Sequence, residues 1–211
     1  MKIRKKITYL QKNEKVLSMS LNILVFYGSV RRDRQGIKAA KFVVRKFAER
    51  GHRVELIDPK ETDLPLLDLM YKEYPSGQAP PEMEELARKI RAADAFVVVS
   101  GEYNHSIPPA LSNLMDHFLE EYFFRPSGIV CYSAGPYGGV RAAMQLRAFL
   151  AEIGTVTIPS LFPVPKVQEA FDEDGNPKNE KMHRYIKTFL DEMEWYGYAL
   201  KEGRVKRKKP Y

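Results

Sequence analysis

Residues 21–48 place a buried strand, a polar turn and an amphipathic helix in direct succession, and this segment constrains the fold most strongly. The run Leu21–Tyr27 is almost unbroken in its apolar character, as is typical of a parallel strand covered on both faces. After a turn at 28–36, apolar residues recur at helical spacing, with lysines and arginines on the opposite side. This succession indicates an α/β fold.

The alternation of strands and helices continues to about residue 200. Strands are predicted at 21–27, 52–58, 95–100, 128–132 and 155–158. Helices are predicted at 37–48, 82–93, 107–118 (capped by Ser106), 140–153 and from 179 onward. Such alternation favours a parallel sheet with helices on both faces. Two long proline-bearing connections, 59–81 and 159–178, are predicted to be irregular.

The turn Gly28–Gly36 has the composition of a phosphate site. Backbone N–H groups at a helix N-terminus attract an anion, and Ser29, Arg31 and Arg34 add a hydroxyl and charged donors. The turn lacks the Gly-x-Gly-x-x-Gly spacing of dinucleotide sites and the Gly-Lys-Ser/Thr ending of triphosphate loops. A terminal phosphate monoester is therefore the expected ligand. An ordinary connection with solvated arginines is the alternative.

Three loops that leave predicted strands carry unusual chemistry, namely 28–36, 101–107 and 133–139. In a parallel sheet the carboxyl ends of the strands meet at one edge, and ligands bind outside that edge. We therefore expect the three loops to surround a single site. Three such loops at one edge of the sheet are stronger evidence for a binding site than any one loop alone.

The basic residues gather at the two ends of the chain. Residues 1–20 and 201–211 each contain six lysines or arginines and one glutamate, so that residues 21–200 carry −3 within a total of +7. We interpret these ends as a peripheral extension and a solvated tail flanking one domain at 21–200, with nucleic-acid contact as the weaker alternative. No apolar run is long enough to span a membrane. The single cysteine, Cys131, excludes an internal disulfide and favours a cytoplasmic location.

The three loops resemble the NADPH-dependent FMN reductase family, which includes quinone, azo-dye and chromate reductases. The matching segments are Gly28–Arg31, Glu102–Pro108 and Ser133–Gly139, and the similarity extends in order and spacing from about Leu21 to Pro163. The resemblance implies a flavodoxin-like three-layer α/β/α sandwich, and we predict a five-stranded parallel sheet in the order 2-1-3-4-5. It also implies FMN as the cofactor, NADPH as the reductant and a small-molecule electron acceptor.

The resemblance further implies which residues contact the cofactor. The phosphate would be held by Ser29, Arg31, Arg34, Gln35 and Gly36. One side of the flavin ring would be lined by Glu102, Tyr103, Asn104 and His105, and the other by Ser133, Gly135, Gly138 and Gly139. The chain departs from the family at Gly101, where proline is usual, and at Gln35-Gly36, where many members carry serine or asparagine.

No catalytic side chain and no metal site is predicted, because the flavin itself would carry the chemistry. A histidine beside a flavin can contact a substrate or titrate near neutral pH, which makes His105 a weak candidate. Donation to a loop carbonyl is the more ordinary role for such a side chain. The remaining histidines are scattered without the spacing of metal ligands.

Three functions fit these loops. The first is an FMN-dependent oxidoreductase that takes hydride from NADPH and reduces free flavin, quinones, azo compounds or metal oxyanions. The second is a flavodoxin-like electron carrier that exchanges electrons with a protein partner. The basic residues Arg31, Arg32, Arg34 and Arg141 favour the first, because such carriers usually present an acidic surface and NADPH bears an additional phosphate. A flavin-dependent protein whose tails bind nucleic acid is the third.

Two aromatic clusters favour a homodimer, or a homotetramer built as a dimer of dimers. One cluster is the segment Phe118–Phe124, and the other comprises Trp195, Tyr196 and Tyr198 near the end of the last helix. Contiguous exposed apolar surface of this kind usually marks an interface. Packing of both clusters within one chain is the alternative.

Overall fold

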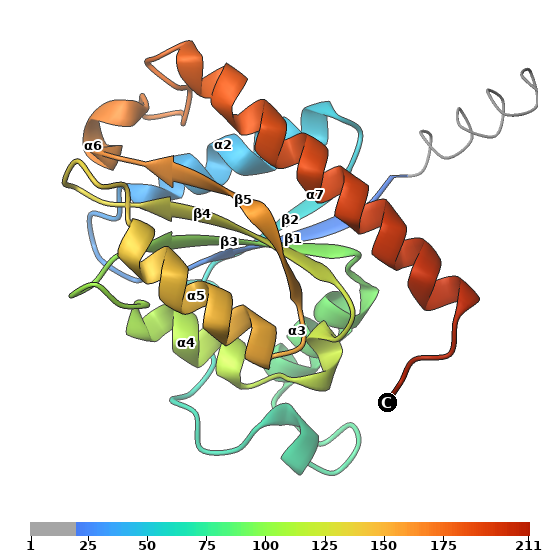
Figure 1. The fold of residues 1–211 in the computed structure, drawn as a ribbon. Coiled ribbons are helices and arrows are strands. Elements are labelled where there is room, and N and C mark those ends of the chain that lie inside the picture. Colours follow the sequence, from blue (N-terminus) through green and yellow to red (C-terminus); the bar gives the residue numbers. More distant parts are fainter. Residues whose placement is uncertain (1–19) are drawn as a thin grey trace, which may run out of the picture.

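The computed structural model describes residues 20–211, and the predicted N-terminal extension lies outside the described residues except for Ser20. A five-stranded sheet forms the centre of the molecule (Figure 1). Its strands are β1 (Asn22–Tyr27), β2 (Arg53–Ile57), β3 (Ala95–Gly101), β4 (Pro126–Tyr132) and β5 (Val156–Val164). All neighbouring strands are parallel, in the order β2-β1-β3-β4-β5. The predicted flavodoxin-like sheet is therefore confirmed.

Helices cover both faces of the sheet and complete three layers. One face carries α2 (Gly36–Glu49) and α7 (Lys181–Lys206), and the other carries α3 (Pro81–Ala92), α4 (Pro109–Asp116) and α5 (Val140–Glu152). The connections contain the short helix α6 (Val167–Ala170) and the single 3-10 turns η1 (Tyr71–Glu73) and η2 (Glu120–Tyr122). Within the described residues no helix combines the length and apolar character needed to cross a bilayer.

The apolar run in β1 follows from burial on both faces of the sheet. Successive residues alternate between two cores, with Val25 in the core beneath α2 and α7 and Phe26 in the core beneath α3, α4 and α5. Both side chains are fully buried. Since successive side chains of a strand point to opposite faces, a central parallel strand needs apolar residues at every position.

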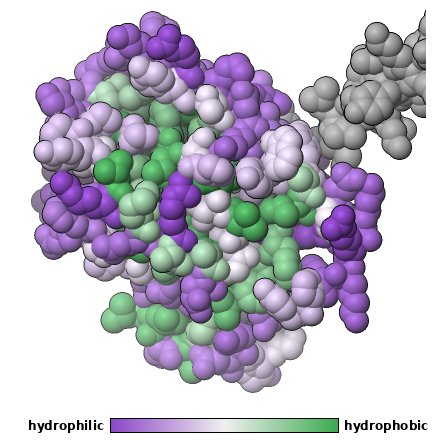
Figure 2. All heavy atoms as spheres, in the orientation of Figure 1, coloured by the Kyte–Doolittle hydropathy of each residue, from purple (hydrophilic) through white to green (hydrophobic). Residues whose placement is uncertain are grey.

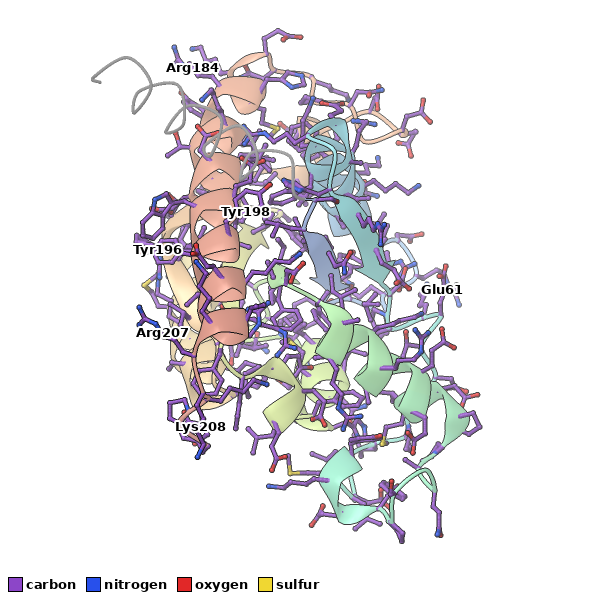
Figure 3. All side chains as sticks on the ribbon, turned by 90° about the vertical axis from the view of Figure 1, so that its right-hand side faces the viewer. Glu61, Arg184, Tyr196, Tyr198, Arg207 and Lys208 are labelled. Atoms are coloured by element: carbon purple, nitrogen blue, oxygen red, sulfur yellow. The ribbon has the colours of Figure 1, made fainter. Side chains whose placement is uncertain are left out.

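Helix α7 continues into the basic C-terminal segment, which was predicted to be a solvated tail. In Figure 3 it runs along one side of the molecule and ends next to Arg207. Near this end Lys201 and Arg204 form ion pairs with Asp94, with N–O distances of 2.7 and 3.1 Å. The prediction of a solvated tail is thus wrong for Lys201 and Arg204, because the carboxylate that pairs with these cations lies far away in the sequence, whereas Val205 and Lys206 are exposed.

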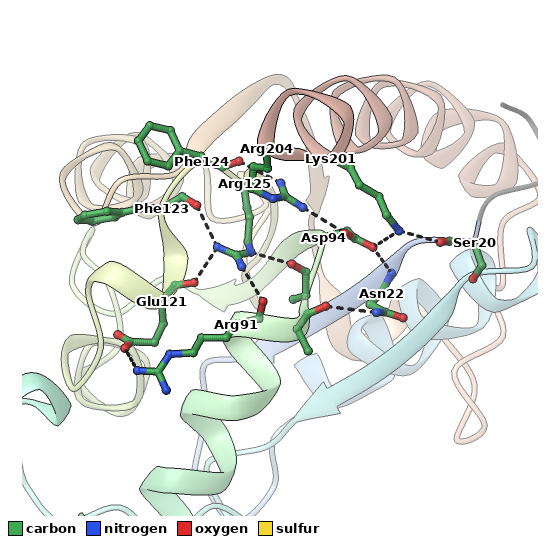
Figure 4. Close-up of polar contacts among 12 residues, drawn as sticks. Ser20, Asn22, Arg91, Asp94, Glu121, Phe123, Phe124, Arg125, Lys201 and Arg204 are labelled. Carbon is green, nitrogen blue, oxygen red and sulfur yellow. Dashed lines mark hydrogen bonds and ion pairs between the residues drawn. The ribbon is translucent and has the colours of Figure 1, made fainter. Parts of the chain in front are cut away.

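The buried side chain of Arg125 joins several elements at the amino-terminal edge of the sheet (Figure 4). Its guanidinium donates hydrogen bonds to the backbone carbonyls of Arg91, Ala93, Glu121 and Phe123. These carbonyls belong to the end of α3 and to the segment around η2, immediately before β4. Burial lowers the pKa of this guanidinium to about 10, so the group stays charged at neutral pH.

Two other local predictions differ from the structure. Strand β5 extends to residue 164 through Pro159 and Pro163, whereas the predicted strand ended at 158. Because β5 lies at the edge of the sheet, a missing backbone N–H can be tolerated there. Ser106 does not cap α4, since its hydroxyl donates a hydrogen bond to Gln145 instead.

The aromatic segment Phe118–Phe124 belongs mainly to the core of a single chain. The side chains of Phe118 and Tyr122 are buried and their rings meet edge to face. Phe123 packs over Gly154, where any side chain would collide with its ring. Packing within one chain therefore accounts for this cluster. Trp195 of the second cluster, by contrast, is 66% exposed.

Candidate cofactor-binding site

A cleft of about 340 Å³ opens at the carboxyl-terminal edge of the sheet, where the three predicted loops meet. Its wall includes these predicted site residues: Ser29, Arg31, Arg34, Gln35, Glu102, Tyr103 and Ser133. The predicted residues Gly36, Asn104, His105, Gly135, Gly138 and Gly139 do not form its wall. A larger hollow of about 530 Å³ lies at the opposite edge beside Arg125, but none of the three loops reaches it.

The first loop places Ser29 and Arg31 at the cleft, where their polar groups can still bind a further partner. The Ser29 hydroxyl lies 3.3 Å from the Tyr103 hydroxyl and accepts the Arg31 backbone N–H at 3.4 Å. Both contacts are long for hydrogen bonds, so the hydroxyl retains capacity for another partner. The Arg31 side chain is exposed, and its guanidinium has no ion-pair partner in the described part of the chain. The loop therefore offers an uncommitted cation beside a hydroxyl.

Arg34, in contrast, is already engaged. Its guanidinium forms two hydrogen bonds with the carboxylate of Asp58, at 2.5 and 2.6 Å, and donates a third to the backbone carbonyl of Ser29 at 3.1 Å. It also lies over the ring of Tyr27, 5.3 Å from the centroid. Bidentate pairing of this kind largely neutralises the charge. Arg34 consequently holds the loop in shape, a role hidden from the sequence because Asp58 follows a different strand.

The second loop is a tight hairpin fixed to α5. Tyr103 and Ser106 exchange backbone hydrogen bonds of 3.1 and 2.9 Å, and the two residues between them have positive φ angles of 51° for Asn104 and 63° for His105. Asparagine tolerates this conformation, whereas histidine adopts it at a cost of roughly 1–2 kcal/mol. The side chain of Gln145 bonds both His105 and Ser106 and so holds the turn. The hairpin is therefore rigid, with His105 beside the cleft rather than in its wall.

Glu102 lies at the N-terminus of α5 rather than facing the cleft with a free carboxylate. It accepts the backbone N–H groups of Arg141 at 3.0 Å and Ala142 at 3.3 Å, together with the Arg141 guanidinium at 3.3 Å. Burial raises the pKa of the Glu102 carboxyl, but these donors outweigh it and hold the pKa below its usual range. The positive end of α5 is therefore already matched by a negative charge.

This arrangement predicts an acid-sensitive contribution from Glu102 to stability. A carboxyl whose pKa is lowered by folding stabilises the protein above its ordinary pKa of 4.5, and the contribution is lost as the pH falls through the lowered value. Glu102→Gln should therefore cost about 0.5–1 kcal/mol at neutral pH, as expected for a helix cap, and less in acid. Urea unfolding at neutral pH and below pH 4.5 measures this difference. An equal loss at both pH values would contradict the assignment.

The third loop is shaped by glycines and held by a hydrogen bond to the segment that follows β5. Gly138 and Gly139 have φ angles of 64° and 77°, and a Cβ on Gly139 would lie 2.6 Å from the backbone oxygen of Tyr132. Close packing against the neighbouring strand thus accounts for Gly139, with no need of a ligand. In the wall of the cleft, the amide of Gln168 donates to the carbonyl of Ala134 at 3.2 Å. This support from the chain just after β5 was not foreseen from the sequence.

Within the described residues no group of three or more His, Cys, Asp or Glu side chains is placed to hold a metal ion. The chemistry of the cleft is instead that of an anion site beside a flat surface. The uncommitted guanidinium of Arg31 and the hydroxyl of Ser29 suit a phosphate, and the phenol ring of Tyr103 suits an aromatic system. The residues present therefore fit a phosphorylated aromatic ligand such as FMN.

Comparisons with known proteins point to one family. The model of the family described as NADPH-dependent FMN reductase matches residues 21–169. An NAD(P)H-dependent FMN reductase of Schizosaccharomyces pombe is 32% identical over 70% of this chain and 76% of its own length. A 2-hydroxy-1,4-benzoquinone reductase from a Burkholderia species is 25% identical over 89% of this chain and all of its own length.

Solved structures agree with these matches. FerB, a flavoenzyme NAD(P)H:acceptor oxidoreductase from Paracoccus denitrificans, superposes with a TM-score of 0.68 at 26% identity, over 85% of this chain and 98% of that one. A flavodoxin from Pseudomonas aeruginosa superposes with a TM-score of 0.52 at 12% identity, over 83% of this chain and 98% of that one. The second likeness supports the fold alone.

Proposed function

The chain belongs to the NADPH-dependent FMN reductase family, and on this premise we propose that it binds FMN in the cleft beside Ser29 and Arg31. NADPH reduces the cofactor, and a small acceptor of the quinone type then takes the electrons. FMN supplies the hydride chemistry when bound, so the protein has to bind and orient the reactants. No side chain is assigned a catalytic role.

The uncommitted guanidinium of Arg31 carries this proposal. Of the two arginines in the described cleft wall, Arg34 pairs with Asp58, whereas Arg31 forms no ion pair. Arg31 is left to neutralise a ligand, and the Ser29 hydroxyl beside it adds a donor. A phosphate bound there would place the attached ring system along the cleft toward Tyr103 and Ser133. Arg34 was also predicted to bind the phosphate, but paired with Asp58 it would instead support the shape of the loop.

The acceptor and the reductant follow from the chemistry of the same region. Relatives are named as quinone reductases, and Tyr103 in the wall of the cleft of this chain offers a ring to a flat acceptor. The exposed residues Arg31 and Arg32 add positive charge at its mouth. This charge favours the additional phosphate of NADPH over NADH. A protein-to-protein electron carrier has less support, since its partner would meet this basic rim.

Anaerobic spectroscopy tests the proposed function. Purified protein mixed with FMN should shift and sharpen the visible flavin absorbance, and NADPH should then bleach it faster than NADH. Adding a benzoquinone should restore the oxidised spectrum. Bleaching by dithionite but by neither nicotinamide would instead identify an electron carrier. Failure to bind FMN would overturn the proposal as a whole.

We also propose a homodimer in a cytoplasmic setting. The single cysteine, Cys131, is buried and free, which suits a reducing compartment. Figure 2 shows apolar side chains between α5 and α7, and the described residues Met144, Val156 and Trp195 are 52%, 42% and 66% exposed. Exposed apolar surface of this extent is typical of an interface, and two-fold dimers are the commonest assemblies.

Light scattering checks this proposal. We expect a mass about twice the 24.3 kDa of one chain, and Trp195→Asp should shift it toward a single chain because the charge would be buried in the interface. Leu66→Asp is the matched control, since Leu66 is 85% exposed but lies in the loop before η1. A parent mass near 24.3 kDa would exclude the dimer.

A further inference from the structure

Tyr132, the last residue of β4, forms the floor of the cleft and was not foreseen as a site residue. Its ring packs against two glycines, Gly36 and Gly101. A Cβ on Gly36 would lie 2.0 Å from the ring carbon that bears the hydroxyl and 2.5 Å from the hydroxyl oxygen. The phenol thus occupies the space of a side chain at the start of α2. Gly36 is required here because Tyr132 fills that space.

Within the described residues, the hydroxyl of Tyr132 has only neutral hydroxyl groups, those of Tyr27 and Ser29, as its side-chain partners. It donates to the hydroxyl of Tyr27 at 3.4 Å, and on the same side of the cleft Ser29 lies 3.3 Å from the Tyr103 hydroxyl. Strong hydrogen bonds between hydroxyls are about 2.7–2.8 Å long, so the Tyr132 O–H can exchange its long contact with Tyr27 for a stronger acceptor. Burial also raises the pKa of the Tyr132 phenol, which keeps its proton in place. The floor of the cleft therefore presents an O–H group that can turn toward an anion.

We propose that the Tyr132 hydroxyl donates a hydrogen bond to the phosphate of FMN and thereby selects the phosphorylated flavin over riboflavin. This inference rests on the proposed function, because it assigns a further ligand to the same cofactor. Arg31 contributes charge at the rim of the cleft, and Tyr132 contributes a directed donor from its floor. Together with Ser29 they would surround the phosphate from three sides.

Tyr132→Phe tests the inference, since it keeps the ring against Gly36 and removes only the hydroxyl. Flavin fluorescence titrations should show FMN binding weakened by about ten- to a hundredfold, the usual loss for a hydrogen bond to a charged group, with riboflavin binding unchanged. Tyr185→Phe is the matched control, because Tyr185 is 58% exposed on α7 and lies outside the cleft wall. It should alter neither titration.

A paired substitution tests whether position 36 and Tyr132 share one space. Gly36→Ser alone should weaken both flavins, because its Cβ collides with the phenol. Combined with Tyr132→Ala, the serine has room, and its hydroxyl should restore part of the preference for FMN that Tyr132→Ala loses. A double variant no better than Tyr132→Ala would overturn the shared-space argument.

The outcomes separate this inference from the proposed function. If the parent protein binds FMN more tightly than riboflavin and Tyr132→Phe retains that full preference, the role of Tyr132 is wrong while the FMN site stands. If the parent protein does not bind FMN, the proposed function fails, and the inference fails with it. Loss of preference for FMN in Tyr132→Phe alone, with riboflavin binding intact, supports both.

Discussion

Replacing Arg125 with methionine should lower the free energy of unfolding by about 3–5 kcal/mol. Methionine keeps much of the side-chain volume but leaves the carbonyls of Arg91, Ala93, Glu121 and Phe123 without their donor. Each unsatisfied buried group costs about 1–3 kcal/mol, although some of these carbonyls will recover water. Since domains of this kind are stable by about 5–15 kcal/mol, the loss is a large fraction of the total. Urea unfolding followed by circular dichroism measures it.

Arg88→Met provides the control for this substitution. Arg88 is exposed on α3, the helix whose end Arg125 holds, so the same chemical change is made without removing buried hydrogen bonds. We expect a change within about 0.5 kcal/mol. Similar losses for both variants would show that charge, rather than the carbonyl contacts, is responsible.

Arg31→Ala should weaken FMN binding by about 1.5–3 kcal/mol, or roughly ten- to a hundredfold in the dissociation constant. The guanidinium is uncommitted at the mouth of the cleft, so its removal disturbs no ion pair of the described structure. The folded state should therefore be unaffected, and the loss should be confined to phosphorylated ligands. Titration with FMN and with riboflavin separates the two effects.

Arg32→Ala is the matched control, because Arg32 is the exposed neighbour of Arg31 and does not form the wall of the cleft. Both substitutions remove one positive charge from the same loop. If each weakened FMN binding equally, the effect would come from the general field of the loop. If neither did, the assignment of the phosphate to Arg31 would be wrong.

The sheet was predictable because the burial of each central strand is visible in its own run of apolar residues. The apolar runs at 21–27, 95–100 and 128–132 are covered on both faces, and this requirement is visible in the local sequence. The end of β5 was not predictable in the same way. Its two prolines are ordinarily signals of an irregular loop, and only its position at the sheet edge makes them compatible with a strand.

The loops of the cleft were predictable, but the state of their side chains was not. The positions of Ser29, Arg31 and Tyr103 follow from the order of the elements, since each leaves the carboxyl end of a strand. That Arg34 is neutralised by Asp58 depends on a contact between residues 24 apart in the sequence. No local pattern distinguishes a paired arginine from a free one, so the two arginines looked equivalent.

The C-terminal segment also shows that a local sequence pattern does not reveal whether a charged side chain has a partner. A run of lysines and arginines usually indicates a solvated segment, and residues 201–206 read that way in isolation. Asp94 contradicts this interpretation, because it immediately precedes β3 and its carboxylate accepts hydrogen bonds from both Lys201 and Arg204. The partner could be identified only once the sheet had placed β3 beside the end of α7.

The contacts of α7 with the amino-terminal edge of the sheet have a consequence for the order in which the protein folds. Lys201 also donates a hydrogen bond to the backbone carbonyl of Ser20, across 181 residues of sequence, and the Asp94 carboxylate accepts the backbone N–H of Asn22. Contacts of such separation form slowly, since closing long loops loses much chain entropy. On the ribosome, β1 emerges long before α7, so the amino end of β1 can first bond to Arg53 and Asp94, and the contact of Lys201 with Ser20 is added only after that helix has been synthesised.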